Sequence, residues 1–308
     1  MNPGTHNRST WREGGPAATV RAADQAEDLR RLVRERPKRA QVVTVTSGKG
    51  GVGKTNLAVN LAIAAAALGK RVVLMDVDLG LANVDVVLNV NSRFNLSHVI
   101  SGKKDILEIL TPAPGNIEIV PGATGIERLA NLDEAERANL LEGIAKLAGR
   151  ADLVFVDTGA GISRNVMGFA TAADRVVVVT TPDPTAVIDA YATVKMILRE
   201  ESRGEVHLVV NMAGTRAEGD RIANGVVEVT RKFLNSYLDY AGFVLADPAV
   251  VQAVRKKRPF LLEYPQAPAS RCVVALAGTL FGEGRRQEPG DGPARPGFFE
   301  RVKNLFRS

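Results

Sequence analysis

A glycine-rich stretch constrains this chain more than any other feature. Residues 47–55 read Ser-Gly-Lys-Gly-Gly-Val-Gly-Lys-Thr and stand between an apolar run, Val42–Val45, and a helical pattern that begins near Asn56. They fit the P-loop form G-x-x-x-x-G-K-[ST], in which backbone N–H groups at a helix N-terminus hold nucleotide phosphates. A structural glycine-rich turn is the alternative, but the strand pattern before the loop and the helix pattern after it favour a nucleotide site.

Each part of this loop has an expected role. The glycines allow positive φ and close approach of the backbone to phosphates. Lys54 would reach the β- and γ-phosphates, and the Thr55 hydroxyl would hold Mg²⁺. The expected cofactors are therefore ATP and Mg²⁺. The residues of this stretch that we expect to contact ATP are Gly48, Gly50, Gly51, Val52, Gly53, Lys54, Thr55 and Asn56.

Strand-like and helix-like patterns alternate from residue 41 onward. Valine-rich apolar runs that predict strands occupy 41–46, 71–76, 117–120, 152–157, 175–180, 206–211 and 242–245. Helical patterns are clearest at 54–68, 134–148, 185–200, 217–234 and 267–281. Continuous apolar strands separated by helices indicate a parallel sheet covered on both faces. We therefore expect an α/β fold with a doubly wound, mostly parallel sheet, as in P-loop NTPases.

Three carboxylates emerge where open parallel sheets bind their ligands. Asp76 and Asp78 follow the run at 71–76, and Asp157 ends the run at 152–157. Buried charge is costly unless it is paired or bound to metal, which argues against packing roles. An apolar strand that ends in Asp is the Walker B arrangement, in which the carboxylate holds Mg²⁺. The alternative is that these carboxylates are N-caps of the segments that follow.

The loop also contains Lys49, a second lysine that an ordinary P-loop does not need. The form Lys-Gly-Gly-Val-Gly-Lys-Thr resembles the deviant Walker A motif of the MinD/ParA ATPases. In that family the extra lysine crosses a dimer interface and contacts the ATP of the partner subunit. The resemblance implies this role for Lys49, and with it a homodimer that forms with ATP. A solvated loop lysine is the alternative.

The same resemblance implies roles for the carboxylates. Asp78 would position the attacking water, and Asp76 would belong to the Mg²⁺ shell. Asp157 would hold Mg²⁺ through a water. The implied activity is slow, dimer-dependent hydrolysis of ATP to ADP and phosphate. The expected catalytic residues are Lys49, Lys54 and Asp78, and the expected metal residues are Thr55, Asp76 and Asp157.

Two residues near the ends of later strands are candidates for the adenine site. Asn211 closes the run at 206–211, where related ATPases place an amide that contacts adenine. A turn-forming Asn is the alternative. Asp247 matches a second adenine contact of the family, although Leu245 stands where the family usually has Pro. The alternative for Asp247 is an N-cap of a helix at 248–255, with Pro248 at its first position.

Four further stretches resemble one family within the MinD/ParA ATPases. Residues 78–85 (DLGLANVD), 95–100 (NLSHVI), 157–163 (DTGAGIS) and 181–185 (TPDPT) together resemble the FlhG family, also called FleN or YlxH. These MinD-like ATPases control flagellar number and placement. The resemblance implies flagellar basal-body (C-ring) components, or a flagellar transcription regulator, as partners. Division-site MinD and chromosome-partitioning ParA match these stretches less well, and a partitioning or division-site ATPase is the alternative.

The N-terminal segment supports the same family. Residues 24–30 (DQAEDLR) resemble the activator motif that stimulates the GTPase of FlhF. Gln25 could orient groups at the partner's nucleotide, while Leu29 and Arg30 anchor the helix. The expected partner-binding residues are Asp24, Gln25, Leu29 and Arg30. Without the resemblance, this stretch is a solvated amphipathic helix that Pro37 ends.

The last twelve residues have the pattern of an amphipathic helix. Phe298, Phe299, Val302, Leu305 and Phe306 fall on one helical face, and the basic residues lie off it. So short a helix is marginal in water, but a bilayer surface could fold it. Two copies in a dimer would gain from effective concentration, so we expect membrane attachment that depends on ATP. Packing against the protein's own body is the alternative.

Charge is distributed unevenly along the chain. The net charge is +6, but residues 1–40 hold nine basic and five acidic side chains, residues 282–308 hold six and four, and the middle is neutral. Basic tails point to tail partners or an anionic surface, and the neutral middle argues against DNA binding by the body. The best candidate for a DNA surface is Arg255-Lys256-Lys257-Arg258, which also fits a solvated helix end.

These observations predict an organisation and a location. We expect a flexible N-terminal segment with the activator helix (1–40), an ATPase domain (41–281), a linker (282–296) and a membrane-targeting helix (297–308). The single cysteine, Cys272, excludes a disulfide framework and argues against the iron–sulfur relatives of this class. Nothing resembles a signal peptide, and no apolar run reaches membrane-spanning length. The expected location is cytoplasmic, peripheral at the inner face of the cell membrane when ATP is bound.

Overall fold

The computed structural model describes residues 1, 40–78, 82–123, 134–200 and 204–282. The expected activator helix, with Asp24 to Arg30, and the expected C-terminal helix, with Phe298 to Phe306, lie outside the described residues. The linker beyond Gly282 also lies outside them. None of the described helices is long and apolar enough to cross a bilayer.

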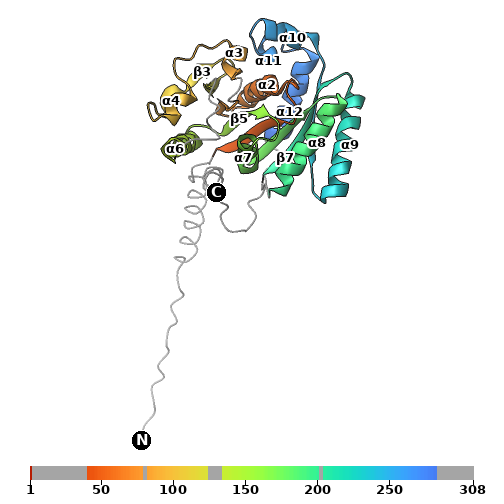
Figure 1. Cartoon of the computed structure of the whole chain (residues 1–308), viewed down its shortest axis with the longest axis horizontal. Helices are drawn as coiled ribbons and strands as arrows, with labels where there is room; N and C mark the ends of the chain where they lie inside the picture. Colours follow the sequence, from red (N-terminus) through yellow and green to blue (C-terminus); the bar gives the residue numbers. More distant parts are fainter. Residues whose placement is uncertain (2–39, 79–81, 124–133, 201–203, 283–308) are drawn as a thin grey trace. The chain divides into compact units, whose positions relative to one another are not determined.

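Within the described residues, a single eight-stranded sheet forms the centre of the fold (Figure 1). Its strand order is β3-β4-β2-β5-β1-β6-β7-β8, and every neighbouring pair is parallel except β3 with β4. The predicted doubly wound, mostly parallel sheet is confirmed. The strands are β1 (Gln41–Ser47), β2 (Val72–Asp76), β3 (Thr111–Ala113), β4 (Ile117–Val120), β5 (Leu153–Ala160), β6 (Arg175–Thr180), β7 (Glu205–Ala213) and β8 (Asp239–Leu245).

Helices cover both faces of the sheet because alternate strand residues point to opposite sides. In β5, Val154 and Val156 belong to one buried cluster, and Leu153 and Phe155 belong to the other. The first cluster is closed by α4 (Leu96–Ile100), α5 (Ile106–Ile109), α6 (Glu134–Arg150), α7 (Arg164–Ala172), α8 (Pro184–Arg199) and α9 (Arg216–Leu234). The second is closed by α2 (Lys54–Ala67), α3 (Val84–Leu88), α10 (Pro248–Arg255), α11 (Phe260–Glu263) and α12 (Pro268–Phe281).

The sequence patterns missed the short elements. All seven predicted strands and all five predicted main helices are present within one to three residues at most ends. β3, an antiparallel edge strand that contains Pro112, carries no apolar run, and α3, α4, α5 and α11 are too short to show a helical period. Edge strands tolerate proline because one side of the strand needs no ladder hydrogen bond. The nine-residue helix α7 was also not predicted.

The register of the central strands brings the predicted site together. β1 lies between β5 and β6, so the P-loop after β1 emerges at the carboxyl edge of the sheet. In the β2–β5 pair, Asp76 stands opposite Asp157. Two carboxylates that are far apart in the sequence therefore meet beside the P-loop.

Candidate functional site

The P-loop requires glycine at three positions, for two different reasons. Gly51 and Gly53 both have φ of 81°, a conformation that other L-residues rarely adopt. A Cβ on Gly48 would lie 2.3 Å from the backbone oxygen of Asp189 on α8, so Gly48 is needed for close packing instead. Gly50 has neither constraint, because its φ is not positive and open space surrounds it. The expectation of positive φ therefore holds for two of the four glycines.

Lys54 and Asp157 form a buried ion pair at the mouth of the loop. Nζ of Lys54 donates to Oδ1 of Asp157 at 2.8 Å, and their side chains are 8% and 1% exposed. Burial raises the pKa of Asp157, while the Lys54 ammonium opposes that shift. The other carboxylate oxygen, Oδ2, is buried and has no hydrogen-bond partner among the described residues. An unpaired buried carboxylate oxygen beside a P-loop is suited to a cation.

Asp76 is tied into the backbone of the segment that follows it. Oδ1 accepts the amide N–H of Asp78 at 3.0 Å, and Oδ2 accepts those of Asn83 and Val84 at 2.9 and 3.1 Å. Burial, and secondarily the charge of Asp157, raises the pKa of Asp76 to about 7. Asp76 thus accepts the first N–H groups at the start of α3, although the N-cap residue of that helix is Asn83. The role of Asp76 in the Mg²⁺ shell stays a prediction.

Asp78 follows β2 and lies beside the carboxyl-terminal part of β5. Its carboxylate is next to Gly159, where an added Cβ would be 3.5 Å from Oδ1 of Asp78. Its charge also contributes to raising the pKa of Asp157. The side chain is half-buried and is held near the carboxyl ends of β2 and β5. This position suits a group that orients a water at the phosphate end of the site.

Lys49 points to the first turn of α8. Its Nζ donates to Oγ1 of Thr185 at 2.5 Å and lies 3.4 Å from Oδ1 of Asp183. The Thr185 hydroxyl in turn donates to Asp183 at 2.6 Å, and Asp183 also accepts the N–H groups of Thr185 and Ala186 as the N-cap of α8. The sequence interpretation singled out 181–185 only for its resemblance, so it missed this partner. The Asp-Pro-Thr pattern does signal an N-cap, but not what that cap binds.

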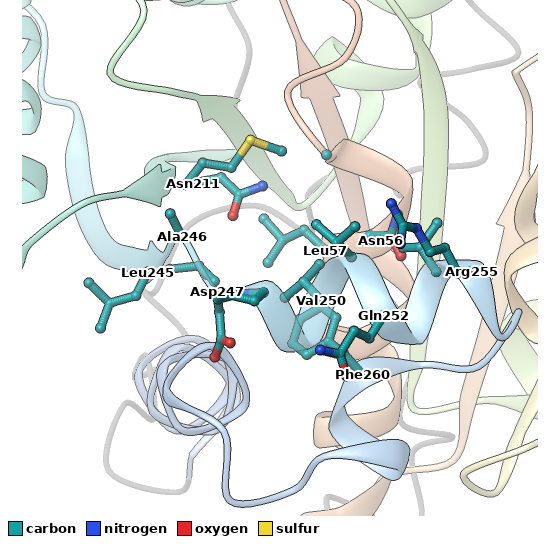
Figure 2. Close-up of a pocket in the computed structure, with 16 residues that line it drawn as sticks. Asn56, Leu57, Asn211, Leu245, Ala246, Asp247, Val250, Gln252, Arg255 and Phe260 are labelled. Carbon is teal, nitrogen blue, oxygen red and sulfur yellow. The ribbon is translucent and has the colours of Figure 1, made fainter.

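A largely apolar cavity of about 1040 Å³ adjoins the loop (Figure 2). Its size is at the upper end of the range for small-molecule sites. Gly53 and Asn56 border it on the side of the P-loop. The remaining lining residues come from α2, β7, β8, α10 and α11: Leu57, Asn211, Met212, Val244, Leu245, Ala246, Asp247, Pro248, Val250, Val251, Gln252, Val254, Arg255 and Phe260.

The two predicted adenine residues behave differently in this cavity. Nδ2 of Asn211 donates to the backbone oxygen of Val52 at 2.8 Å. This hydrogen bond connects the cavity wall at β7 to the P-loop. Asp247 points away from the Asn211 amide (Figure 2). Its carboxylate accepts the N–H of Ala249 at 2.9 Å and that of Ala269 at 3.1 Å, so it caps both α10 and α12. The structure therefore gives Asp247 the N-cap role that was the alternative.

Comparison with known proteins identifies the family. A family model described as an AAA domain matches residues 40–204. The antiactivator FleN of Pseudomonas aeruginosa is 40% identical over 237 residues, which cover 77% of this chain and 85% of FleN. The chain belongs to the FleN/YlxH family of MinD-like ATPases. The flagellum site-determining protein YlxH of Helicobacter pylori is 33% identical over 77% of this chain and 81% of its own length. As a member of this family, the chain is an ATPase, as predicted.

Solved structures support the same fold. The septum site-determining protein MinD of Pyrococcus horikoshii, solved in complex with Mg-ADP, superposes with a TM-score of 0.66 at 24% identity. The match covers 77% of this chain and 94% of that one. The doubly wound sheet that the strand and helix patterns predict, and the MinD-like fold that the motif resemblance implies, are thus both present in this FleN/YlxH-family chain.

The residues of the site fit ATP and Mg²⁺. A Cβ on Gly53 would lie 2.5 Å from Nδ2 of Asn211, so there is no room for a side chain at this position. The backbone of Gly53 therefore lines the cavity where it meets the P-loop. Oδ2 of Asp157 supplies an oxygen of the kind that Mg²⁺ prefers, and Thr55 stands directly after Lys54 at the start of α2. In this FleN/YlxH-family site, Thr55 and Asp157 are the groups best suited to hold the metal.

One buried residue that the sequence did not indicate supports the cavity wall. Asn60, on α2, is fully buried and donates from Nδ2 to the backbone oxygen of Asn56 at 2.7 Å. Its Oδ1 accepts the N–H of Leu261 at 2.9 Å, which ties α11 and its cavity residue Phe260 to the P-loop helix. A polar residue inside an apolar helix was the available signal, because a buried amide needs hydrogen-bond partners.

Proposed function

We propose that this chain is an ATP-dependent, dimerising switch ATPase that controls the number or placement of flagella. The observation that carries this proposal is the 40% identity with FleN over 77% of the chain. The supporting site chemistry is the group of Lys49, Lys54, Asp78 and Asp157 at one edge of the sheet. These are the residue types that nucleotide binding, metal binding and water activation require.

In the proposed cycle, ATP binding breaks the Lys54–Asp157 ion pair, and Lys54 contacts the phosphates instead. In that pair the Lys54 ammonium lies 2.8 Å from Oδ1 of Asp157. Asp157 and Thr55 would then hold Mg²⁺, which neutralises phosphate charge when bound. Asp78 would orient the attacking water, while Asp76 keeps the segment after β2 in place through its three backbone hydrogen bonds.

Dimerisation requires the Lys49 side chain to give up its contacts with Thr185 and Asp183 of its own chain. These contacts are at the surface, where the Lys49 and Asp183 side chains are 40% and 50% exposed. Exposed ion pairs contribute little, so this contact opposes the change only weakly. Lys49 would then contact the ATP of the second copy, and hydrolysis would end the dimer's lifetime.

The N-terminal and C-terminal segments would bind the partners of this ATPase and the membrane. The helix at 297–308, with Phe298, Phe299, Val302, Leu305 and Phe306, would bind a membrane when two copies are joined. The segment with Asp24, Gln25, Leu29 and Arg30 would stimulate the FlhF GTPase. Basal-body (C-ring) components or a flagellar transcription regulator are the proposed downstream partners.

Size-exclusion chromatography of the wild type and of Asp78→Ala, each with Mg-ADP and with Mg-ATP, tests the proposal. We expect both proteins to be monomers in ADP. Asp78→Ala should bind ATP, fail to hydrolyse it and persist as a dimer. If Asp78→Ala stays monomeric at saturating Mg-ATP, the dimer switch is wrong. If it hydrolyses ATP at the wild-type rate, the role of Asp78 is wrong.

A further inference from the structure

The outward side of α12 carries no carboxylate. Residues 264–282 contain no Asp or Glu, and Arg271 is their single basic residue. The exposed positions of α12 include Arg271, Val274 (52% exposed), Ala275 and Thr279. By contrast, the exposed side of α9 mixes both signs, with Glu228 and Arg231 among its exposed residues. The α12 side would therefore approach an anionic surface without repulsion from carboxylates.

A cationic ridge adjoins this side, and we define it as Arg255–Arg258 together with Leu262. Lys256 and Arg258 both pair with Glu263, at 2.7 and 3.0 Å. The structure shows no ion pair between Arg255 or Lys257 and another described residue. Glu263 pairs with two of the four cations, so the ridge keeps a net positive charge, and Leu262 is 45% exposed.

The ridge and the α12 side form one continuous part of the molecule. α10 packs on α11 and α11 packs on α12. Residues 283–308, with the proposed membrane-binding helix, follow directly after α12, which ends at Phe281. The proposed anchor is thus attached to the end of the helix whose side lacks carboxylates.

We propose that the cationic ridge and the outward side of α12 form a second membrane contact, in which the ATPase domain itself meets anionic lipid headgroups. Lys257 would lie near the headgroup charges, and Leu262 would enter the interface. This inference rests on the proposed membrane attachment but adds a separate surface to it. A basic surface with exposed aliphatic side chains fits lipid better than DNA, because phosphates on a duplex would leave Leu262 and Val274 facing water.

Vesicle co-sedimentation of the full-length protein in Mg-ATP tests this contact. The vesicles are phosphatidylcholine with or without phosphatidylglycerol. Lys257→Glu should weaken binding to the anionic vesicles by about 30-fold, since each basic residue near such a surface contributes about fivefold to tenfold and the change spans two charges. The loss should shrink as salt is raised from about 0.1 M to about 0.5 M. Lys103→Glu is the matched control, because Lys103 is exposed and follows α4, on the other face of the sheet.

A second variant, Phe298→Glu with Phe306→Glu, separates this inference from the proposed C-terminal anchor. Weakening by Lys257→Glu but not by Lys103→Glu supports the ridge, whatever the tail variant does. If only the tail variant loses binding, the anchor stands and the ridge is overturned. Absence of wild-type binding overturns both. Salt-sensitive retention of duplex DNA that Lys257→Glu abolishes, with vesicle binding unchanged, would assign the ridge to DNA and also overturn the inference. Equal thermal melting of the variants checks that each is folded.

Discussion

Nζ of Lys49 donates a hydrogen bond to Oγ1 of Thr185 at 2.5 Å, within one chain and across 136 residues of sequence. Asp183, 3.4 Å from the same ammonium, completes the contact. The lysine proposed to reach a second nucleotide is therefore held by the first turn of α8. Because α8 also packs against Gly48 through the backbone of Asp189, the position of this helix and that of the loop are linked.

Asp183→Asn should strengthen the ATP-dependent dimer slightly. Asn is as good an N-cap as Asp, so α8 keeps its cap while Lys49 loses its charge partner. The gain should be at most about fivefold, because exposed ion pairs contribute little. Lys49→Ala should abolish the dimer. Sedimentation equilibrium in Mg-ATP measures both, and a strong loss of dimer in Asp183→Asn would show that Asp183 acts in the interface itself.

Lys54→Met should destabilise the nucleotide-free protein. It leaves the Asp157 carboxylate, 1% exposed, without its cation. Removing one partner of a buried pair typically costs about 3–5 kcal/mol. Urea unfolding should show the loss, and Lys54→Met combined with Asp157→Asn should recover most of it because no unpaired charge remains. A double variant no more stable than Lys54→Met would contradict this account.

Asp76 should make the nucleotide-free protein less stable as pH rises. Its folded pKa, about 7, is above the unfolded value, so the folded state binds more protons between these two values. Its contribution is therefore most favourable below the unfolded pKa and is lost as pH rises to about 7. Between about pH 5.5 and 7.5 the loss should be about 2 kcal/mol. The measurement is the difference in urea unfolding between the wild type and Asp76→Asn at the two pH values. Parallel pH profiles would show that Asp76 does not titrate in this range.

Asp247→Ala should affect stability more than ATP affinity. The carboxylate caps α10 and α12 through Ala249 and Ala269, and losing a cap typically costs about 1 kcal/mol. We expect a loss of about 1–2 kcal/mol in unfolding free energy and a change of less than about threefold in the Kd for ATP. Asp247→Asn should retain part of the cap. A large change in Kd with unchanged stability would support the predicted adenine contact instead.

Gln25→Ala should reduce stimulation of the FlhF GTPase without altering the intrinsic ATPase. Gln25 lies outside the ATPase domain in sequence, so the P-loop and its carboxylates stay intact. GTP hydrolysis by FlhF, measured with a titration of wild-type or variant protein, reports the effect. Asn7→Ala is a matched control in the same N-terminal segment, and full stimulation by Gln25→Ala would remove the assignment.

Local sequence patterns were enough to predict the fold class of this protein and the edge of the sheet at which its site lies. Among the described residues, valine runs and helical periods predicted the seven parallel strands and the five longest helices, and the P-loop form predicted which edge of the sheet binds nucleotide. The carboxylates at strand ends were predicted to meet there, and the pairing of Asp76 with Asp157 in the β2–β5 register brings them together. These features depend on residues that are close in the sequence, or on the common direction of parallel strands.

Only the tertiary structure decided what each polar side chain contacts. Whether Asp247 binds a base or caps a helix depends on where the N–H of Ala269 lies, and the partner of Lys49 depends on how α8 packs. Asn60 shows the same limit, since its acceptor serves Leu261, which is 201 residues away. A side chain's residue type fixes which hydrogen bonds it is able to form, but the packing of distant segments determines which partner is within reach.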